Sequence, residues 1–150
     1  MAKKLNGTAK TAWDAFAQWS RVKGCIETTG LPYVGVCVTC DKRFHITYLD
    51  AGHCFAGKGN ARLFHEKLVN NQCRMCNRFR DGRAAKYRKR MDKKYGVEQV
   101  DIWKAEGNKP ISDKNMDWEA IKIKYREKLH DLLVPFGYNN YEEMKQGHQF

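Results

Sequence analysis

The sequence predicts an α+β fold in which a small metal-bound core is flanked by helices at both ends. Three observations support this: apolar residues at helical spacing near both ends, two runs rich in β-branched residues, and two Cys-x-x-Cys pairs. A chain of 150 residues suits one domain. We therefore expect a single domain over residues 1–150, with an N-terminal helix at 10–30, a metal-bound core and basic helix at 33–95, C-terminal helices at 97–136 and a tail at 137–150.

The first third of the chain predicts one helix and two short strands. Trp13, Phe16 and Ser20 fall at helical spacing, so a helix is expected from about residue 10, with its aromatic side chains in the core. Residues 33–38 and 43–49 are rich in β-branched and aromatic residues and predict two strands around the first cysteine pair.

The second half of the chain predicts three helices. Residues 73–96 are strong helix formers with an expected interruption at Asp81-Gly82, and residues 97–103 predict a short helix. A longer helix is expected to start near Ser112 or Asp117, since both are good N-cap residues.

The charge balance favours a polyanionic partner. The chain has 28 Lys and Arg against 17 Asp and Glu, a formal net charge of +11. Nucleic acid is the first candidate and a membrane surface the second. No stretch approaches the roughly 20 apolar residues that span a bilayer, and the first four residues lack an apolar signal core. We therefore expect a soluble, intracellular protein without a membrane partner.

Four of the six cysteines form two pairs with the spacing of metal knuckles: Cys37-x-x-Cys40 and Cys73-x-x-Cys76. Three disulfides, two redox motifs or unrelated buried thiols are the alternatives, and a basic chain without a signal peptide favours metal over them. Four thiolates leave zinc no open position, so the predicted role of Zn²⁺ is structural. The unpaired Cys25 and Cys54 are expected to be small buried side chains.

Candidate catalytic residues lie in the insert between the knuckles and directly after the second one. In a one-metal phosphodiesterase, a neutral histidine deprotonates a water molecule while a divalent cation stabilises charge on the phosphate. His53 and Asn77 suit these two roles, with Asp50 as another candidate ligand. Taken singly, His53 can equally be a hydrogen-bonded structural residue, and Asn77 can cap the following helix.

These motifs resemble those of known protein families. Cys-x-x-Cys, Gly-His and Cys-x-x-Cys-Asn in this order resemble the zinc-bound HNH (ββα-metal) nucleases. Three longer strings resemble the phage NinG (Rap) recombination proteins, and the likeness covers roughly residues 10 to 130: Asp50-Ala51-Gly52-His53, Gln72-Cys73-Arg74-Met75-Cys76-Asn77-Arg78-Phe79-Arg80-Asp81-Gly82 and Asp92-Lys93-Lys94-Tyr95-Gly96.

The resemblance implies a ββα-metal core and an endonuclease that cuts branched or single-strand-containing DNA during recombination, in the cytosol of a bacterial host. It also implies His53 as the base, Asn77 and Asp50 as ligands of Mg²⁺ or Mn²⁺, and a histidine-orienting asparagine where this chain has Leu68. Many HNH enzymes carry an aspartate before the base, where this chain has Gly52. Asn70 is the first candidate to replace the missing asparagine, ahead of Asn60, His65 or a backbone carbonyl.

The positive charge is concentrated after the second knuckle, where residues 74–94 hold ten Lys or Arg and two Asp, a surplus of +8. A charge run is often only a solvated face, but beside candidate metal ligands it favours contacts to DNA phosphates. The predicted contacts are Arg74, Arg78, Arg80, Arg83, Lys86, Arg88, Lys89, Arg90, Lys93 and Lys94. Phe79 and Tyr87 within this run are expected to pack inward.

Three functions remain open at this point. The first is a metal-dependent DNA endonuclease, which would need a homodimer to cut two strands symmetrically. The second is a non-catalytic zinc module that binds DNA through the basic helix. The third is an RNA-binding or assembly protein, which would expose aromatic side chains among the basic residues.

Overall fold

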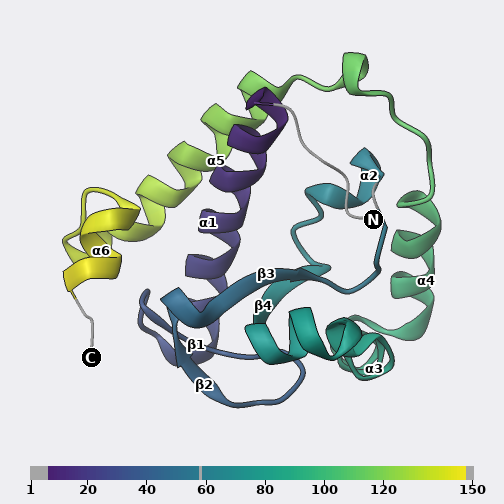
Figure 1. The fold of residues 1–150 in the computed structure, drawn as a ribbon, viewed down its shortest axis with the longest axis horizontal. Coiled ribbons are helices and arrows are strands. Elements are labelled where there is room, and N and C mark those ends of the chain that lie inside the picture. The colour runs from purple at the N-terminus through teal and green to yellow at the C-terminus, as the bar shows by residue number, and fades with distance from the viewer. Residues whose placement is uncertain (1–6, 58, 148–150) are drawn as a thin grey trace.

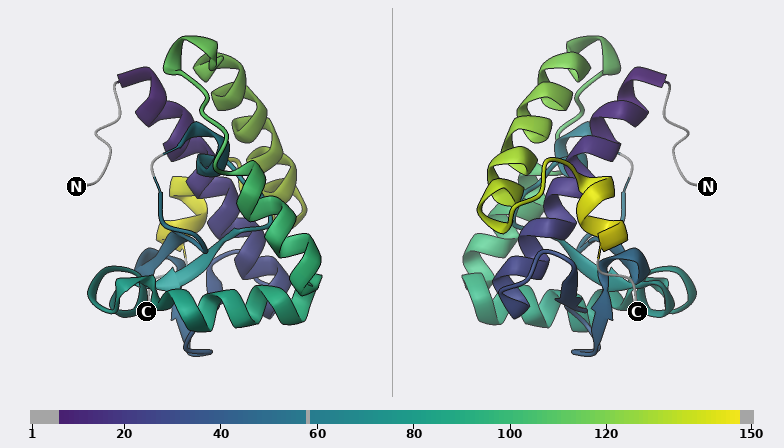
Figure 2. Two further views of the ribbon diagram at one scale, coloured as in Figure 1. Left: turned by 90° about the vertical axis from the view of Figure 1, so that its right-hand side faces the viewer. Right: turned by 90° about the vertical axis from the view of Figure 1, so that its left-hand side faces the viewer.

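The structure is a computed structural model that describes residues 7–57 and 59–147. A long helix, α1 (Gly7–Thr29), lies at its centre, with α5 (Trp118–Leu133) packed along one side and two antiparallel strand pairs at its C-terminal end (Figure 1). The two further views confirm that α1 and α5 lie side by side (Figure 2). The architecture is therefore α+β, as the sequence predicted.

Each strand pair is a two-stranded antiparallel sheet. β1 (Val34–Val36) pairs with β2 (Arg43–His45), and β3 (Leu49–His53) pairs with β4 (Val69–Cys73). The expected strand over residues 43–49 is interrupted by a 3₁₀ turn, η1 (Ile46–Tyr48), because the His45 side chain accepts a hydrogen bond from the Thr47 backbone N–H. β4 was not predicted.

The β3–β4 pair has two faces with different neighbours. The register places Leu49 opposite Cys73 and His53 opposite Val69, so odd-numbered residues of both strands share one face. That face packs on α1: Leu49 and Val69 lie in the main core with Phe16 and Trp19. Even-numbered residues point to the other face, toward the helices that follow β4.

Those helices form a second layer. A π-helical turn, η2 (Met75–Phe79), and a 3₁₀ turn, η3 (Asp81–Arg83), lead into α3 (Ala84–Tyr95) and α4 (Val97–Glu106). The predicted interruption is confirmed, since Gly82 has a φ of 66° inside this segment. Tyr87 and Met91 of α3 pack on Leu68 and Cys54 in a second core. α2 (Asn60–Leu63) lies in the connection between β3 and β4.

The C-terminal segment is better ordered than the sequence predicted. α5 begins after Asp117, whose carboxylate accepts a hydrogen bond from the Ala120 backbone N–H at 3.0 Å. The predicted tail contains another helix, α6 (Tyr141–Gly147), whose Met144 is fully buried in the main core. The expectation of a loose tail over 137–150 is thus wrong for residues 141–147. No helix in the described ranges is long and apolar enough to cross a membrane.

Candidate metal centre and catalytic residues

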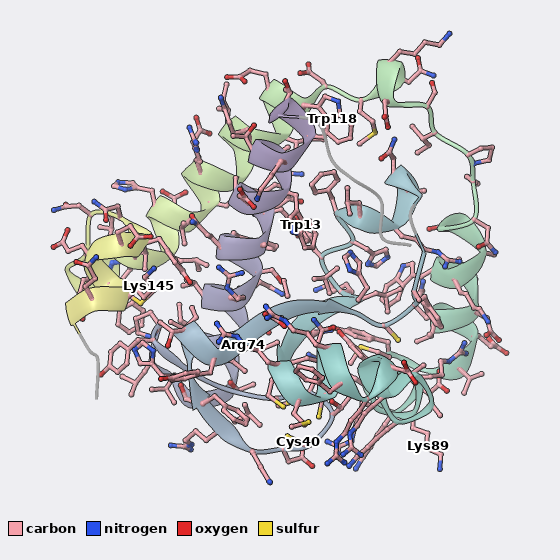
Figure 3. The ribbon with its side chains drawn as sticks, viewed as in Figure 1. Trp13, Cys40, Arg74, Lys89, Trp118 and Lys145 are labelled. Carbon is pink, nitrogen blue, oxygen red and sulfur yellow. The ribbon has the colours of Figure 1, made fainter. Side chains whose placement is uncertain are left out.

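The four paired cysteines converge as the sequence predicted. The sulfur atoms of Cys37, Cys40, Cys73 and Cys76 all lie within 4.8 Å of one another, and 3.9 Å separates the Sγ atoms of Cys40 and Cys73. Zinc–sulfur bonds of about 2.3 Å in a tetrahedron would separate the sulfur atoms by about 3.8 Å. The cluster therefore fits a structural Zn²⁺, and Figure 3 shows Cys40 beside other sulfur atoms at the lower edge of the fold.

Local backbone geometry aims the four thiols at one point. The first pair sits on a tight turn after β1, closed by hydrogen bonds from the Asp41 backbone N–H to the Cys37 carbonyl and from the Cys37 N–H to the Lys42 carbonyl. Cys73 ends β4 and Cys76 lies on η2. A bound metal would therefore tie the β1–β2 unit to the junction between β4 and the basic helices.

His53 ends β3 on the face that packs against α1. Its ring stacks on Trp13, with the ring centroids 5.1 Å apart and the planes 20° from parallel. Burial lowers the pKa of His53 below its ordinary value, although the nearby Leu63 carbonyl opposes the shift. The imidazole is therefore mostly neutral at pH 7.

A backbone carbonyl orients this imidazole. His53 Nε2 lies 3.2 Å from the Leu63 carbonyl oxygen, which can only accept, so Nε2 carries the proton. Nδ1 is then the basic nitrogen, and no hydrogen bond occupies it among the residues that the structure describes. Of the candidates raised by the sequence, the carbonyl is the one found at the ring.

The side-chain alternatives are engaged elsewhere. Asn70 donates to the Tyr87 hydroxyl at 3.1 Å, and Asn60 donates to Asp113 at 2.8 Å. His65 accepts hydrogen bonds from the backbone N–H groups of Lys67 and Leu68. None of these three side chains orients His53 through these hydrogen bonds.

Asp50 and Asn77 meet on the opposite face of the strand pair. The Asn77 amide donates to an Asp50 carboxylate oxygen at 3.1 Å. Arg78 binds the same carboxylate with two parallel hydrogen bonds of 2.9 Å. This ion pair was not foreseen, although the spacing of Asn77 and Arg78 after the knuckle places both beside β3. It neutralises Asp50, whose side chain is only 17% exposed.

The predicted catalytic residues are therefore divided between two faces. Asp50 and His53 are three positions apart along β3, which corresponds to about 10 Å and to opposite sides of the strand. His53 contacts α1 through Trp13, whereas Asp50 contacts η2 through Asn77 and Arg78. The structure brings the two candidate metal ligands together and places the candidate base on the other face.

The basic segment contains paired and unpaired cations. Besides Arg78, Arg88 pairs with Asp92 and Asp101, and Arg90 pairs with Asp41. Lys86, Lys89 and Lys93 are exposed and form no ion pair with the described residues. They lie on one side of α3 at i, i+3 and i+7, away from the buried Tyr87, and Figure 3 shows Lys89 pointing outward. This set is called the α3 lysine stripe below.

Two expectations about aromatic residues have opposite outcomes. Tyr87 is fully buried, and its hydroxyl donates to the Gly52 carbonyl at 2.7 Å, which confirms that it packs inward. Phe79 is 74% exposed, so the prediction that it packs inward is wrong. It ends a π-helical turn, and the helical phase that the sequence suggests does not continue through that turn.

The two unpaired cysteines are buried, as predicted. Burial raises the pKa of Cys25 to about 12 and that of Cys54 to about 11, despite opposing nearby arginines. Both thiols stay protonated at neutral pH and are poor nucleophiles or metal ligands. Cys54 therefore takes no chemical role beside His53.

Comparison with known proteins gives one informative result. No curated protein and no solved structure matches the chain. The family model described as bacteriophage lambda NinG protein matches residues 1–133, which include the cysteine cluster, both faces of the β3–β4 pair and the basic segment. The chain therefore belongs to the family of the bacteriophage lambda NinG protein.

Proposed function

We propose that this protein is a DNA endonuclease that acts on branched or single-strand-containing recombination intermediates of a phage, in the cytosol of the bacterial host. The observation that carries the proposal is the state of His53: a neutral imidazole whose Nε2–H is held by the Leu63 carbonyl and whose Nδ1 remains basic. Membership of the NinG family and the order strand, strand, helix around the cysteine cluster support it.

The proposed chemistry assigns His53 the role of general base. Nδ1 takes a proton from a water molecule, whose oxygen attacks the phosphorus while the bond to the leaving oxygen breaks and that oxygen takes a proton from solvent. The Leu63 carbonyl favours the required tautomer and stabilises the imidazolium that forms. A cavity of about 10 Å³ beside His53 has room for roughly one water molecule.

Asp50 and Asn77 are the residues that would hold a catalytic Mg²⁺ or Mn²⁺. They offer a carboxylate and an amide oxygen, the donor types that these ions prefer. Their side chains are in contact through the Asn77 Nδ2, so the amide must turn for its oxygen to face an ion beside Asp50. The cation would stabilise negative charge on the phosphate. Arg78 occupies both carboxylate oxygens, so it must move aside for the ion to bind. Since His53 faces α1, joint action of base and ion also requires the strand pair to shift relative to α1.

The test is cleavage of forked, flap and four-way DNA by purified protein with Mg²⁺ or Mn²⁺. His53→Ala should lower the rate by about 10²- to 10⁴-fold, the usual contribution of a general base. His130→Ala is the matched control, because His130 is exposed on α5, and it should cut like wild type. Cleavage by wild type no faster than by His53→Ala would refute the assignment.

The second candidate is a non-catalytic zinc module that binds recombination DNA. The Arg78–Asp50 ion pair and the position of His53 on the other face favour it. Arg78→Gln separates the two candidates because it frees the carboxylate. A nuclease should then need less Mn²⁺ for half-maximal cleavage. A binding module should bind DNA with strong salt dependence and should not cut it, whichever divalent cation is added.

A further inference from the structure

The two most exposed aromatic side chains in the described ranges lie on turns that contact each other. Phe79 and Tyr48 are the most exposed of the large apolar side chains in the described ranges, at 74% and 58%. Met75, on the same turn as Phe79, is 53% exposed. The two turns that carry them touch, because Arg74 donates from Nη2 to the Thr47 carbonyl at 2.7 Å. The remaining exposed apolar side chains, such as Ile102 on α4, are aliphatic or less exposed.

The surroundings of these aromatics are positively charged. The Arg74 guanidinium lies over the Tyr48 ring, 5.7 Å from its centroid. Arg80 and Arg83 follow Phe79, and the nearby carboxylate of Asp50 is neutralised by Arg78. A surface for an apolar protein partner would not need this charge, whereas aromatic rings between arginines match a ligand that combines flat apolar groups with phosphates.

A duplex alone gives the rings little to bind. The bases of a duplex are stacked on each other, so an exposed ring gains stacking energy only where a base is unpaired or where a helix ends. The α3 lysine stripe begins seven residues after Phe79 and supplies charges suited to the phosphates of an adjoining duplex arm. Rings and stripe together match a junction between paired and unpaired DNA.

We propose that Phe79 and Tyr48, with Arg74 held over the Tyr48 ring, form a stacking platform for the unpaired nucleobases at a branch point. This inference rests on the proposed function because its ligand is DNA. It identifies the unpaired bases as the part of the substrate that the protein distinguishes. Phe79 is a specificity residue here and takes no part in bond cleavage.

Binding of a fork and of a duplex with the same arms, measured by fluorescence anisotropy without added Mg²⁺ or Mn²⁺, tests this proposal. A 2-aminopurine base at the first unpaired position of the fork reports stacking through its quenching. Phe79→Ala should weaken fork binding by about 5- to 100-fold, leave duplex binding within about twofold, and abolish the quenching. Phe79→Trp should restore both signals, and Tyr48→Ala should act in the same direction as Phe79→Ala.

Ile102→Ala is the matched control, since it removes an exposed apolar side chain from α4 and should change neither affinity. Unchanged fork binding by Phe79→Ala, an equal loss for fork and duplex, or failure of Phe79→Trp to restore binding would overturn the platform. The proposed cleavage requires Mg²⁺ or Mn²⁺, which are left out of the binding assay, so its outcome is separate from that of the nuclease assay. A protein that stacks fork bases but never cuts upholds the platform and refutes the endonuclease.

Discussion

Gly52 and His53 are neighbours in the chain but are constrained from different sides of the strand pair. A Cβ atom on Gly52 would lie 2.1 Å from the Gln72 side-chain oxygen, on the face toward α3. Gln72 is fully buried and donates to the Gly82 carbonyl and the Thr39 hydroxyl. The space beside Gly52 is thus filled by the amide of a neighbouring strand. The sequence shows a glycine before His53, but not what occupies the space beside it.

Gly52→Ala should destabilise the fold by about 1–3 kcal/mol, because Gln72 has no room to retreat without losing its buried hydrogen bonds. The midpoint of urea unfolding measures the effect. Gly59→Ala is the matched control: its φ is −72°, and the nearest atom to an added Cβ is 3.6 Å away. Equal midpoints for the two variants would contradict the steric argument.

Part of the pH dependence of stability is expected from His53 on the same strand. Burial lowers the pKa of His53 in the folded state below its value in the unfolded chain, about 6.5. Its contribution is complete above pH 6.5 and is lost as the pH falls through the folded pKa. The urea midpoint of wild type should fall from pH 7.5 to pH 5, and by less in His53→Gln. Some dependence should persist, because burial also lowers the pKa of His65. Equal pH dependence in both proteins would exclude His53 as a source of the pH dependence of stability.

At the scale of elements, sequence patterns predicted the longer helices but missed α2, α6 and the polar strand β4. The aromatic spacing in α1, the Asp117 cap and the stop at Gly96 reappear in the structure. β4 contains Asn70, Asn71 and Gln72, residue types that favour turns or surfaces, so its pattern does not predict a strand. Their amides bind interior groups instead, as Asn71 does with the Arg21 carbonyl at 3.0 Å.

The sequence alone did not show which cations of the basic segment are free to contact phosphates. Ion pairs engage Arg78, Arg88 and Arg90 with aspartates, and only the folded chain reveals those partners. The lysines at 86, 89 and 93 remain on one side of α3. Phosphate contacts by this helix are therefore expected from the α3 lysine stripe before any of the paired arginines.

Replacement of the α3 lysine stripe by glutamine should weaken binding to duplex and fork alike. Each phosphate contact contributes about 0.9 to the slope of log affinity against log salt concentration, so the slope should decrease by about 2 to 3. A triple variant of Lys109, Lys114 and Lys124, all exposed outside this segment, has the same charge and serves as control. An equal slope change in the control would show that net charge, and not the stripe, determines affinity.

At the scale of the whole molecule, the cysteine cluster is the feature that sequence spacing identified best. Tetrahedral ligation depends on short local turns, and the Cys-x-x-Cys spacing specifies those turns directly. The relative position of His53 and Asn77 depends on strand parity and on the packing of α1, which no local motif encodes. The zinc ligands were therefore predictable as a set, whereas the two faces of the candidate site were not.

One tightly bound Zn²⁺ per chain is the expected metal content of the purified protein. Cys76→Ser should lose this zinc and more than about 3 kcal/mol of unfolding free energy, because binding at such a site contributes directly to folding. Cys54→Ala also removes a buried thiol but lies outside the cluster, and it should retain one zinc. Metal analysis and thermal unfolding provide the readouts. Zinc retained by Cys76→Ser would refute four-thiolate ligation.

The pairing of α1 with α5 has a consequence for synthesis in the cell. α1 leaves the ribosome well before its main helical neighbour, which begins at Trp118, more than a hundred residues after the start of α1. Phe16 and Trp19 contact Tyr125 of that neighbour, so part of their apolar surface stays uncovered until α5 has been translated. The nascent polypeptide consequently exposes an aggregation-prone amphipathic segment until α5 has left the ribosome.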